Sequence, residues 1–143
     1  MATTPRESFM PGQPGLVRQA AVTPVRDGQV CLVTSRGGKR WVIPKGTIEP
    51  GRSAGEVALA EAWEEAGLVG LLTQEPLGSY LYEKDGSVCH VIVFRMAVTG
   101  TADTSPETGL RQRAWVSAAQ AADRVEDLGL RDILRGLAAP GGA

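Results

Sequence analysis

The sequence has few of the residues that mark a disulfide scaffold, a thiolate metal site or a membrane protein. Its only cysteines are Cys31 and Cys89, and both lie in apolar, strand-like runs. Such cysteines are typical of small buried side chains. No apolar run approaches the roughly 18 residues of a membrane span, and the N-terminus lacks the basic and apolar regions of a signal peptide. We therefore expect a cytoplasmic protein with no membrane partner.

Aromatic residues and excess charge are also scarce. Phe, Trp and Tyr make up 5% of the 143 residues, which leaves few side chains to stack on a nucleotide base. The net charge is −1, so nucleic acid is an unlikely partner. A hydrophobic content of 43% and this length fit one globular domain with a core of its own. The oligomeric state stays open.

Turn-forming residues divide the chain into three parts. Residues 1–15 are rich in Pro, Gly, Ser and Thr without an apolar period, so we expect a disordered N-terminal segment, and residues 139–143 form a disordered tail. Residues 16–138 are the predicted single domain. Its expected elements are a hairpin turning at Asp27-Gly28, the strand "RWVIP", two β-rich runs around Asp85-Gly86, the strand "RAWVS" and an interrupted helical region after Ser117. This order predicts an α/β (α+β) fold with a mixed sheet flanked by helices.

One helix has clearer signals than any other element. Ser53 and Glu56 fit a capping box and Gly67 fits a C-terminal cap, which predicts a helix from about Ala54 to Ala66. Its charged residues are all glutamates. Trp63, inside this helix, is expected to pack in the core, as are Trp41 and Trp115.

Three of the glutamates fall on one side of the helix. At roughly 100° per residue, Glu61, Glu64 and Glu65 share a face, where like charges repel by a few tenths of a kcal/mol per pair. A divalent cation compensates such a cluster, and magnesium prefers oxygen ligands, with one or two carboxylates, waters and substrate phosphates in its shell. A solvated acidic face is the alternative interpretation.

A basic segment precedes this acidic helix. Between Thr34 and Arg52 one acid, Glu49, stands against five bases, a balance of +4; the bases are Arg36, Lys39, Arg40, Lys45 and Arg52. Gly46 allows a ligand to approach the backbone closely. Bases for phosphate, carboxylates for magnesium and a glycine that clears the backbone are the parts needed to cleave a phosphoanhydride.

The segment from Pro44 to Leu68 resembles a Nudix box. The residues that match the family pattern in register are Gly46, Glu61, Ala62, Glu64, Glu65, Gly67 and Leu68. Arg52 stands where the family has its first Glu, and Ala60 where it has Arg. In the family that pair is thought to interact with each other or with the metal-binding helix.

The resemblance implies a Nudix-type α/β/α sandwich with a mixed β-sheet. It also implies hydrolysis of a nucleoside diphosphate linked to another moiety, or of a related pyrophosphate, with Mg²⁺ or Mn²⁺. Carried over by position, Glu61 and Glu65 would bind the metal most directly, and the Gly46 carbonyl would be an additional ligand. Glu64 would be a further ligand or the base that orients water, so that Glu64 and Glu61 are the expected catalytic residues.

Within the family the chain is similar to the diphosphoinositol polyphosphate phosphohydrolases, which also cleave diadenosine polyphosphates. The similar stretches are "RQAAV", "LVTSRGGKRWVIPKG", "EAWEEAG" and "RAWVS". By charge and position, the residues expected to bind substrate phosphates are Arg18, Arg36, Lys39, Arg40, Lys45 and Arg113. Each of them can alternatively be a solvated surface charge.

Other functions remain open. Arg52 and Ala60 are compatible with an inactive Nudix-like module that senses a phosphate ligand or binds a protein. Among enzymes, the alternatives are a nucleotide-sugar pyrophosphatase and an RNA 5′-pyrophosphohydrolase.

Overall fold

The computed structural model describes residues 15–107 and 109–139. The elements in chain order are β1 (Leu16–Arg26), β2 (Gln29–Thr34), β3 (Trp41–Val42), β4 (Lys45–Thr47), α1 (Ala54–Ala66), β5 (Leu68–Leu72), β6 (Gly78–Lys84), β7 (Ser87–Thr101), β8 (Arg113–Ser117), α2 (Ala118–Arg124) and α3 (Leu128–Ala138). No helix in the described part is long and apolar enough to cross a membrane. Residues 1–14 and 140–143, most of the two segments predicted to be disordered, lie outside the description.

The eight strands form one mixed sheet organised around two long central strands. β1 and β7 run parallel over ten paired residues, from Leu16↔Val88 to Val25↔Ala97, and the other pairs are antiparallel. β1 changes its second partner along its length, because residues 19–21 pair with β4 and residues 25–26 pair with β2. β2 also pairs with β3 and β8, and β7 with β5 and β6. The sheet therefore opens between β4 and β2.

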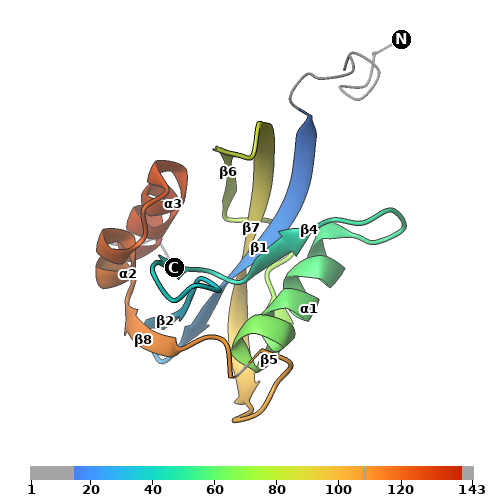
Figure 1. The fold of residues 1–143 in the computed structure, drawn as a ribbon. Helices are drawn as coiled ribbons and strands as arrows, with labels where there is room; N and C mark the ends of the chain where they lie inside the picture. The colour runs from blue at the N-terminus through green and yellow to red at the C-terminus, as the bar shows by residue number, and fades with distance from the viewer. Residues whose placement is uncertain (1–14, 108, 140–143) are drawn as a thin grey trace.

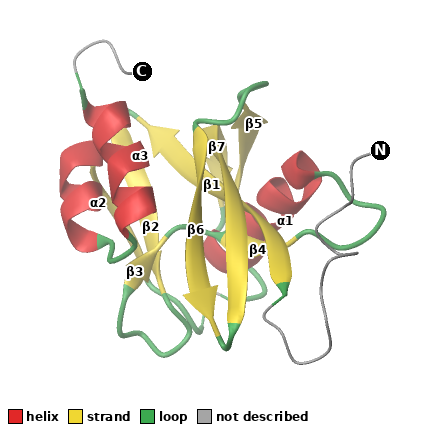
Figure 2. Cartoon of the chain, turned by 90° about the horizontal axis from the view of Figure 1, so that it is seen from above, coloured by secondary structure: helices red, strands yellow, loops and turns green. Residues whose placement is uncertain are grey.

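Helices cover both faces of this sheet. α1 lies on one face and α2 with α3 on the other (Figures 1 and 2). Successive residues of β1 point to opposite faces, so Ala20 and Val22 pack with α1 whereas Ala21 packs with the other two helices. Because both faces of the sheet are covered, residues 20–24 of β1 are all buried rather than alternating between buried and exposed. The predicted α/β/α sandwich is confirmed.

The helix expected at residues 54–66 has those bounds in the structure. The Ser53 hydroxyl accepts a hydrogen bond from the Glu56 N–H (3.1 Å), and the Glu56 carboxylate accepts one from the Ser53 N–H (2.8 Å). Gly67 ends the helix in the left-handed region at φ 67°. The capping box at Ser53 and the glycine at Gly67 set where the helix begins and ends, and so set which residues, including the glutamates, are helical.

Two features of this region differ from expectation. Trp63 is 39% exposed rather than in the core, because the apolar face of α1 consists mainly of Val57 and small alanines that pack tightly on the sheet. Residues 45–47, which were not among the expected strands, form the short strand β4. Trp41 and Trp115 do pack against the cores.

Candidate active site

The site begins where α1 touches β4. A Cβ atom added to Gly46 would lie 2.6 Å from both Cδ and Oε2 of Glu61, a distance that real side chains do not show. Only glycine therefore lets the Glu61 carboxyl group lie directly against the backbone of β4. Gly46 was expected to let a ligand approach the backbone, and the group that lies against it in the structure is the Glu61 carboxyl group.

The three glutamates on the shared face lie together. The Glu61 carboxyl group interacts with those of Glu65 and Glu64. Burial, and then the contact with Glu65, raises the pKa of Glu61 to about 7. Burial also raises the pKa values of Glu64 and Glu65, although Arg111 and Lys45 oppose the rise at Glu65. Two carboxyl groups this close need a proton or a cation between them.

This arrangement fits a magnesium ion only in part. Among the described residues, no three His, Cys, Asp or Glu side chains already stand as a complete metal-binding group. Magnesium does not require one, because it usually takes one or two carboxylates and completes its shell with water and substrate phosphate. Glu61, paired with Glu64 or Glu65, supplies the oxygen donors and uncompensated charge for such a site.

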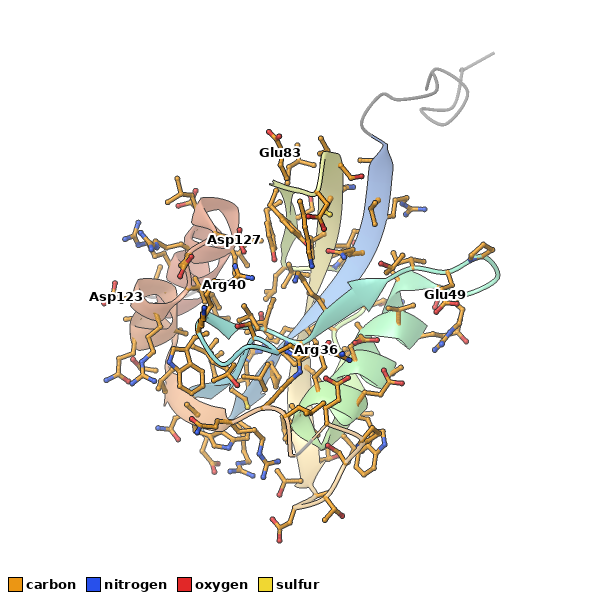
Figure 3. All side chains as sticks on the ribbon, viewed as in Figure 1. Arg36, Arg40, Glu49, Glu83, Asp123 and Asp127 are labelled. Atoms are coloured by element: carbon orange, nitrogen blue, oxygen red, sulfur yellow. The ribbon has the colours of Figure 1, made fainter. Side chains whose placement is uncertain are left out.

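A cavity of about 260 Å³ opens beside the cluster, between α1 and the gap in the sheet. Glu65, which is 7% exposed, forms part of one wall. The basic residues that line the cavity are Arg36, Arg40, Lys45, Lys84 and Arg111. In the view of Figure 3, Arg36 lies toward α1 and Arg40 toward Asp127 at the start of α3. Five cations facing one carboxylate make this cavity strongly attractive to anions.

Three of the residues expected to bind phosphate line this cavity: Arg36, Arg40 and Lys45. Lys39 is exposed in the turn before β3 and is not among the lining residues. Arg18 is also exposed, whereas its neighbour Gln19 lines the cavity, because successive strand residues point to opposite faces.

Arg113 has a different environment from the one expected. Its Nη1 donates hydrogen bonds to the carbonyls of Ala66 (2.8 Å) and Ala102 (3.2 Å), so it fastens the end of α1 to the loop after β7. It does not line the cavity.

Several lining residues were not identified from the sequence. The Tyr82 hydroxyl donates a hydrogen bond to Gln19 Oε1 (2.7 Å), and Lys45 Nζ lies 5.2 Å from the centre of the Tyr82 ring. Lys84 follows two residues later on the same side of β6. Burial lowers the pKa of Lys45, and the charge of Glu65 acts in the opposite direction. Side chains of a strand such as β6 alternate between two faces, but the sequence does not show which of the two sets faces the cavity.

A loop before β8 adds a further acid, Glu107, and a further base, Arg111, to the site. The Glu107 N–H donates to the Glu64 carbonyl (3.0 Å), and the Glu107 carboxylate accepts from Arg111 Nε (2.8 Å). The negative charge of Glu107 contributes to the raised pKa values of Glu61, Glu64 and Glu65. Arg36 also lies 3.8 Å from Glu107.

Comparison with known proteins agrees with this geometry. Residues 16–137 match the family described as the NUDIX domain. The chain belongs to the Nudix family. It is 38% identical over 108 residues to Nudix hydrolase 4 of Arabidopsis thaliana, covering 74% of this chain and 52% of that protein. It is 32% identical over 108 residues to Nudix hydrolase 18, mitochondrial, of the same plant, covering 74% and 61%. The chain thus spans between about half and three fifths of the length of these relatives.

Solved Nudix structures share the fold. A NUDIX hydrolase from Nitrosomonas europaea superposes with a TM-score of 0.70 at 22% identity, covering 86% of this chain and 87% of that one. A MutT protein from Methanosarcina mazei Go1 gives the same TM-score and identity and covers 87% and 93%. At this identity the likeness shows the α/β/α architecture alone.

Proposed function

We propose that this Nudix protein is a magnesium-dependent pyrophosphohydrolase that cleaves a phosphoanhydride bond in a highly phosphorylated small molecule. One observation carries the proposal: a single cavity has Glu65 of the glutamate cluster on one wall and five basic residues around it. A site for phosphate therefore adjoins a site for a divalent cation. A protein that only needed a stable helix would gain nothing from three adjacent carboxyl groups.

The basic residues most accessible from the cavity would bind the substrate. Arg36 and Arg40 offer planar guanidinium groups that bind phosphate oxygens in pairs, whereas Lys45 and Lys84 act as point charges. The charge of Lys45 acts on Glu65, which places Lys45 near the reacting region. Arg18, Lys39 and Arg113 are not part of this proposal.

The glutamates would supply the chemistry. Glu61 and Glu65 would hold Mg²⁺, or Mn²⁺ in its place, with the Gly46 carbonyl as the further ligand that the family pattern implies. When bound, the metal lowers the pKa of water and shields charge on phosphate. Glu64, less buried than Glu65, would orient the attacking water and accept its proton. No covalent link to the protein is required.

The substrate class follows from the charge of the cavity. Four basic residues besides Arg111 exceed what one diphosphate needs, and Tyr82 is the one aromatic residue in the cavity lining. Both points support a diphosphoinositol polyphosphate or a diadenosine polyphosphate over a substrate recognised chiefly through its base. Buried, unpaired Cys31 and Cys89 support a reducing compartment such as the cytoplasm.

The test is product release by the purified protein with and without Mg²⁺. The substrates are diphosphoinositol polyphosphate, diadenosine polyphosphates, nucleotide sugars and RNA with a 5′-triphosphate end. Magnesium-dependent turnover of the first two supports the proposal. Turnover restricted to nucleotide sugars or RNA would show that the proposed substrate class is wrong. Tight binding without turnover would favour the sensor interpretation.

A further inference from the structure

Arg111 occupies a central position beside the glutamate cluster. Its side chain is 10% exposed, and Nε donates to Glu107 Oε1 at 2.8 Å while Nη1 donates to the Thr34 carbonyl at 2.9 Å. Nη1 also lies 3.8 Å from Glu65 Oε1, and the Glu65 side chain is 8% exposed. One buried guanidinium thus connects the end of β2, the loop before β8 and α1.

The helix itself has no cation that could take this place. α1 contains no Lys or Arg, and Ala60 stands where the family pattern has arginine. Burial raises the pKa of Glu65, and the nearby charges of Arg111 and then Lys45 oppose this rise. Lys45 Nζ also faces the Tyr82 ring. Among these two, only Arg111 is fixed by hydrogen bonds to other parts of the protein.

We propose that Arg111 is a positioning residue: it sets the orientation of the Glu65 carboxylate, and of Glu107 beside it, for the reaction. The argument is geometric. A guanidinium held in place by Glu107 and the Thr34 carbonyl cannot turn, so Nη1, which also bonds Thr34, presents a fixed positive charge to Glu65. The inference rests on the proposed function, because positioning matters only where a reaction or metal uses Glu65.

Arg111 could alternatively bind the substrate directly, since it also lines the cavity. The two roles give different kinetics. Loss of a substrate contact raises KM, whereas loss of positioning lowers kcat. Arg111 is also far less accessible than Arg36, whose side chain is 72% exposed, and two of the five guanidinium N–H groups of Arg111 donate to protein atoms.

The first experiment compares Arg111→Gln with Arg111→Lys and wild type in steady-state kinetics with Mg²⁺. We expect Arg111→Gln to lower kcat by about 10- to 100-fold with KM changed by less than about twofold, as for a small misplacement of a reacting group. Arg111→Lys keeps the charge but cannot make the same set of contacts, so it should recover part of kcat. An unchanged kcat, or a loss of kcat/KM that lies entirely in KM, would overturn the proposal.

The second experiment needs no turnover and uses Mn²⁺ alone as the probe. Free Mn²⁺ is counted by electron paramagnetic resonance during titration of wild type, Arg111→Gln, Glu65→Gln and the double variant. Removing the Arg111 cation should make Mn²⁺ bind more tightly, because Glu65 loses its nearby positive charge, and removing Glu65 should weaken Mn²⁺ binding; an Arg111→Gln protein that binds Mn²⁺ as wild type does would overturn the proposal. If Arg111 acts through Glu65, the effect of Arg111→Gln should disappear in the Glu65→Gln background. Additive effects would overturn the proposal.

Arg131→Gln is the matched control for loss of a half-buried arginine. Arg131 donates a hydrogen bond to the Val125 carbonyl (2.8 Å) between α2 and α3, away from the glutamates. It should lower the melting temperature without changing kcat or Mn²⁺ binding. If Arg111→Gln does not fold, Arg111→Lys replaces it in both experiments. We then expect a smaller fall in kcat and an effect on Mn²⁺ binding that again disappears in the Glu65→Gln background.

The two proposals fail in different ways. Wild type that releases no product with any substrate contradicts the proposed function, yet the Mn²⁺ cycle still decides whether Arg111 and Glu65 are coupled. Wild type that turns over while Arg111→Gln is equally active contradicts only the role of Arg111.

Discussion

The two walls of the cavity are built in opposite ways. The acidic wall comes from a single helix, where the spacing of Glu61, Glu64 and Glu65 brings the carboxyl groups together without help from the rest of the fold. The basic wall comes from the turn after β2, from β4, from β6 and from the loop before β8. A local motif can therefore specify the chemistry of a site, while the fold assembles what the site recognises.

If this contrast holds, the largest losses of turnover should come from the acidic wall. Glu64→Gln or Glu65→Gln should lower kcat by at least about 100-fold, because a neutral amide neither binds the cation as a carboxylate does nor accepts a proton. Glu64 is only half-buried, so its replacement should leave the melting temperature nearly unchanged. Wild-type turnover in both variants would refute the assignment of the cluster.

A methyl group at Gly46 should disturb the junction of the two walls. Gly46→Ala would push against the Glu61 carboxyl group, and we expect a fall in kcat of about tenfold or more with destabilisation of about 1–3 kcal/mol. Gly55→Ala, in α1, is the matched control, since a Cβ atom at Gly55 would lie at an ordinary distance of 3.5 Å from Leu72. It should be neutral or stabilising by up to about 1 kcal/mol. Equal activity and denaturation midpoints for the two variants would show that the close contact is unimportant.

A pair of adjacent residues tests the basic wall. Arg40 lines the cavity and Lys39 does not, so Arg40→Gln should raise KM for a polyphosphate substrate by about tenfold, the value of one charged hydrogen bond, with kcat little changed. Lys39→Gln should leave KM near that of wild type. Equal KM values would mean that charge near the cavity, rather than the assembled wall, governs binding.

The smallest predicted effect concerns pH and stability. The pKa of Glu61 is about 7 in the folded, metal-free protein against 4.5 as the ordinary value, so the folded state binds this proton more tightly than the unfolded state does. This contribution to stability is complete below pH 4.5 and is lost as the pH rises through 7. Of the melting temperatures measured at pH 6 and pH 8.5, the second should be lower by a few degrees on account of this group.

Two comparisons isolate the contribution of Glu61. Mg²⁺ should raise the melting temperature more at pH 8.5 than at pH 6, because the cation replaces the proton. Glu61→Gln should reduce the difference between the two pH values. An equal difference in wild type and variant would place the pH dependence elsewhere in the protein.

The contrast between the walls also explains what the sequence could predict. Helix α1 was placed from its caps, and the hairpin turns at Asp27-Gly28 and Asp85-Gly86 were placed from their composition, because these signals act over a few residues. The parallel pairing of β1 with β7 joins segments about 70 residues apart, and no local signal records it.

The same limit applies to individual site residues. Arg113 and Arg111 are two residues apart and equally charged, yet the first bonds backbone carbonyls and the second lies beside Glu65. Arg18 and Gln19 are neighbours on β1 and point to opposite faces of the sheet, and only the folded structure shows that Gln19 faces the cavity. Charge and proximity to a motif were therefore insufficient to choose the phosphate-binding residues.

The change of partner along β1 has a consequence for how this protein can vary. A close-packed domain normally opens a hollow only by deleting side chains, and this costs stability. Here the cavity lies beside the point where β1 changes its partner from β4 to β2, since Gln19 of β1 and Lys45 of β4 both line it. Replacement of Arg40 or Lys84 can then change which anion the cavity binds with little loss of folding free energy, so the same fold can acquire new substrates.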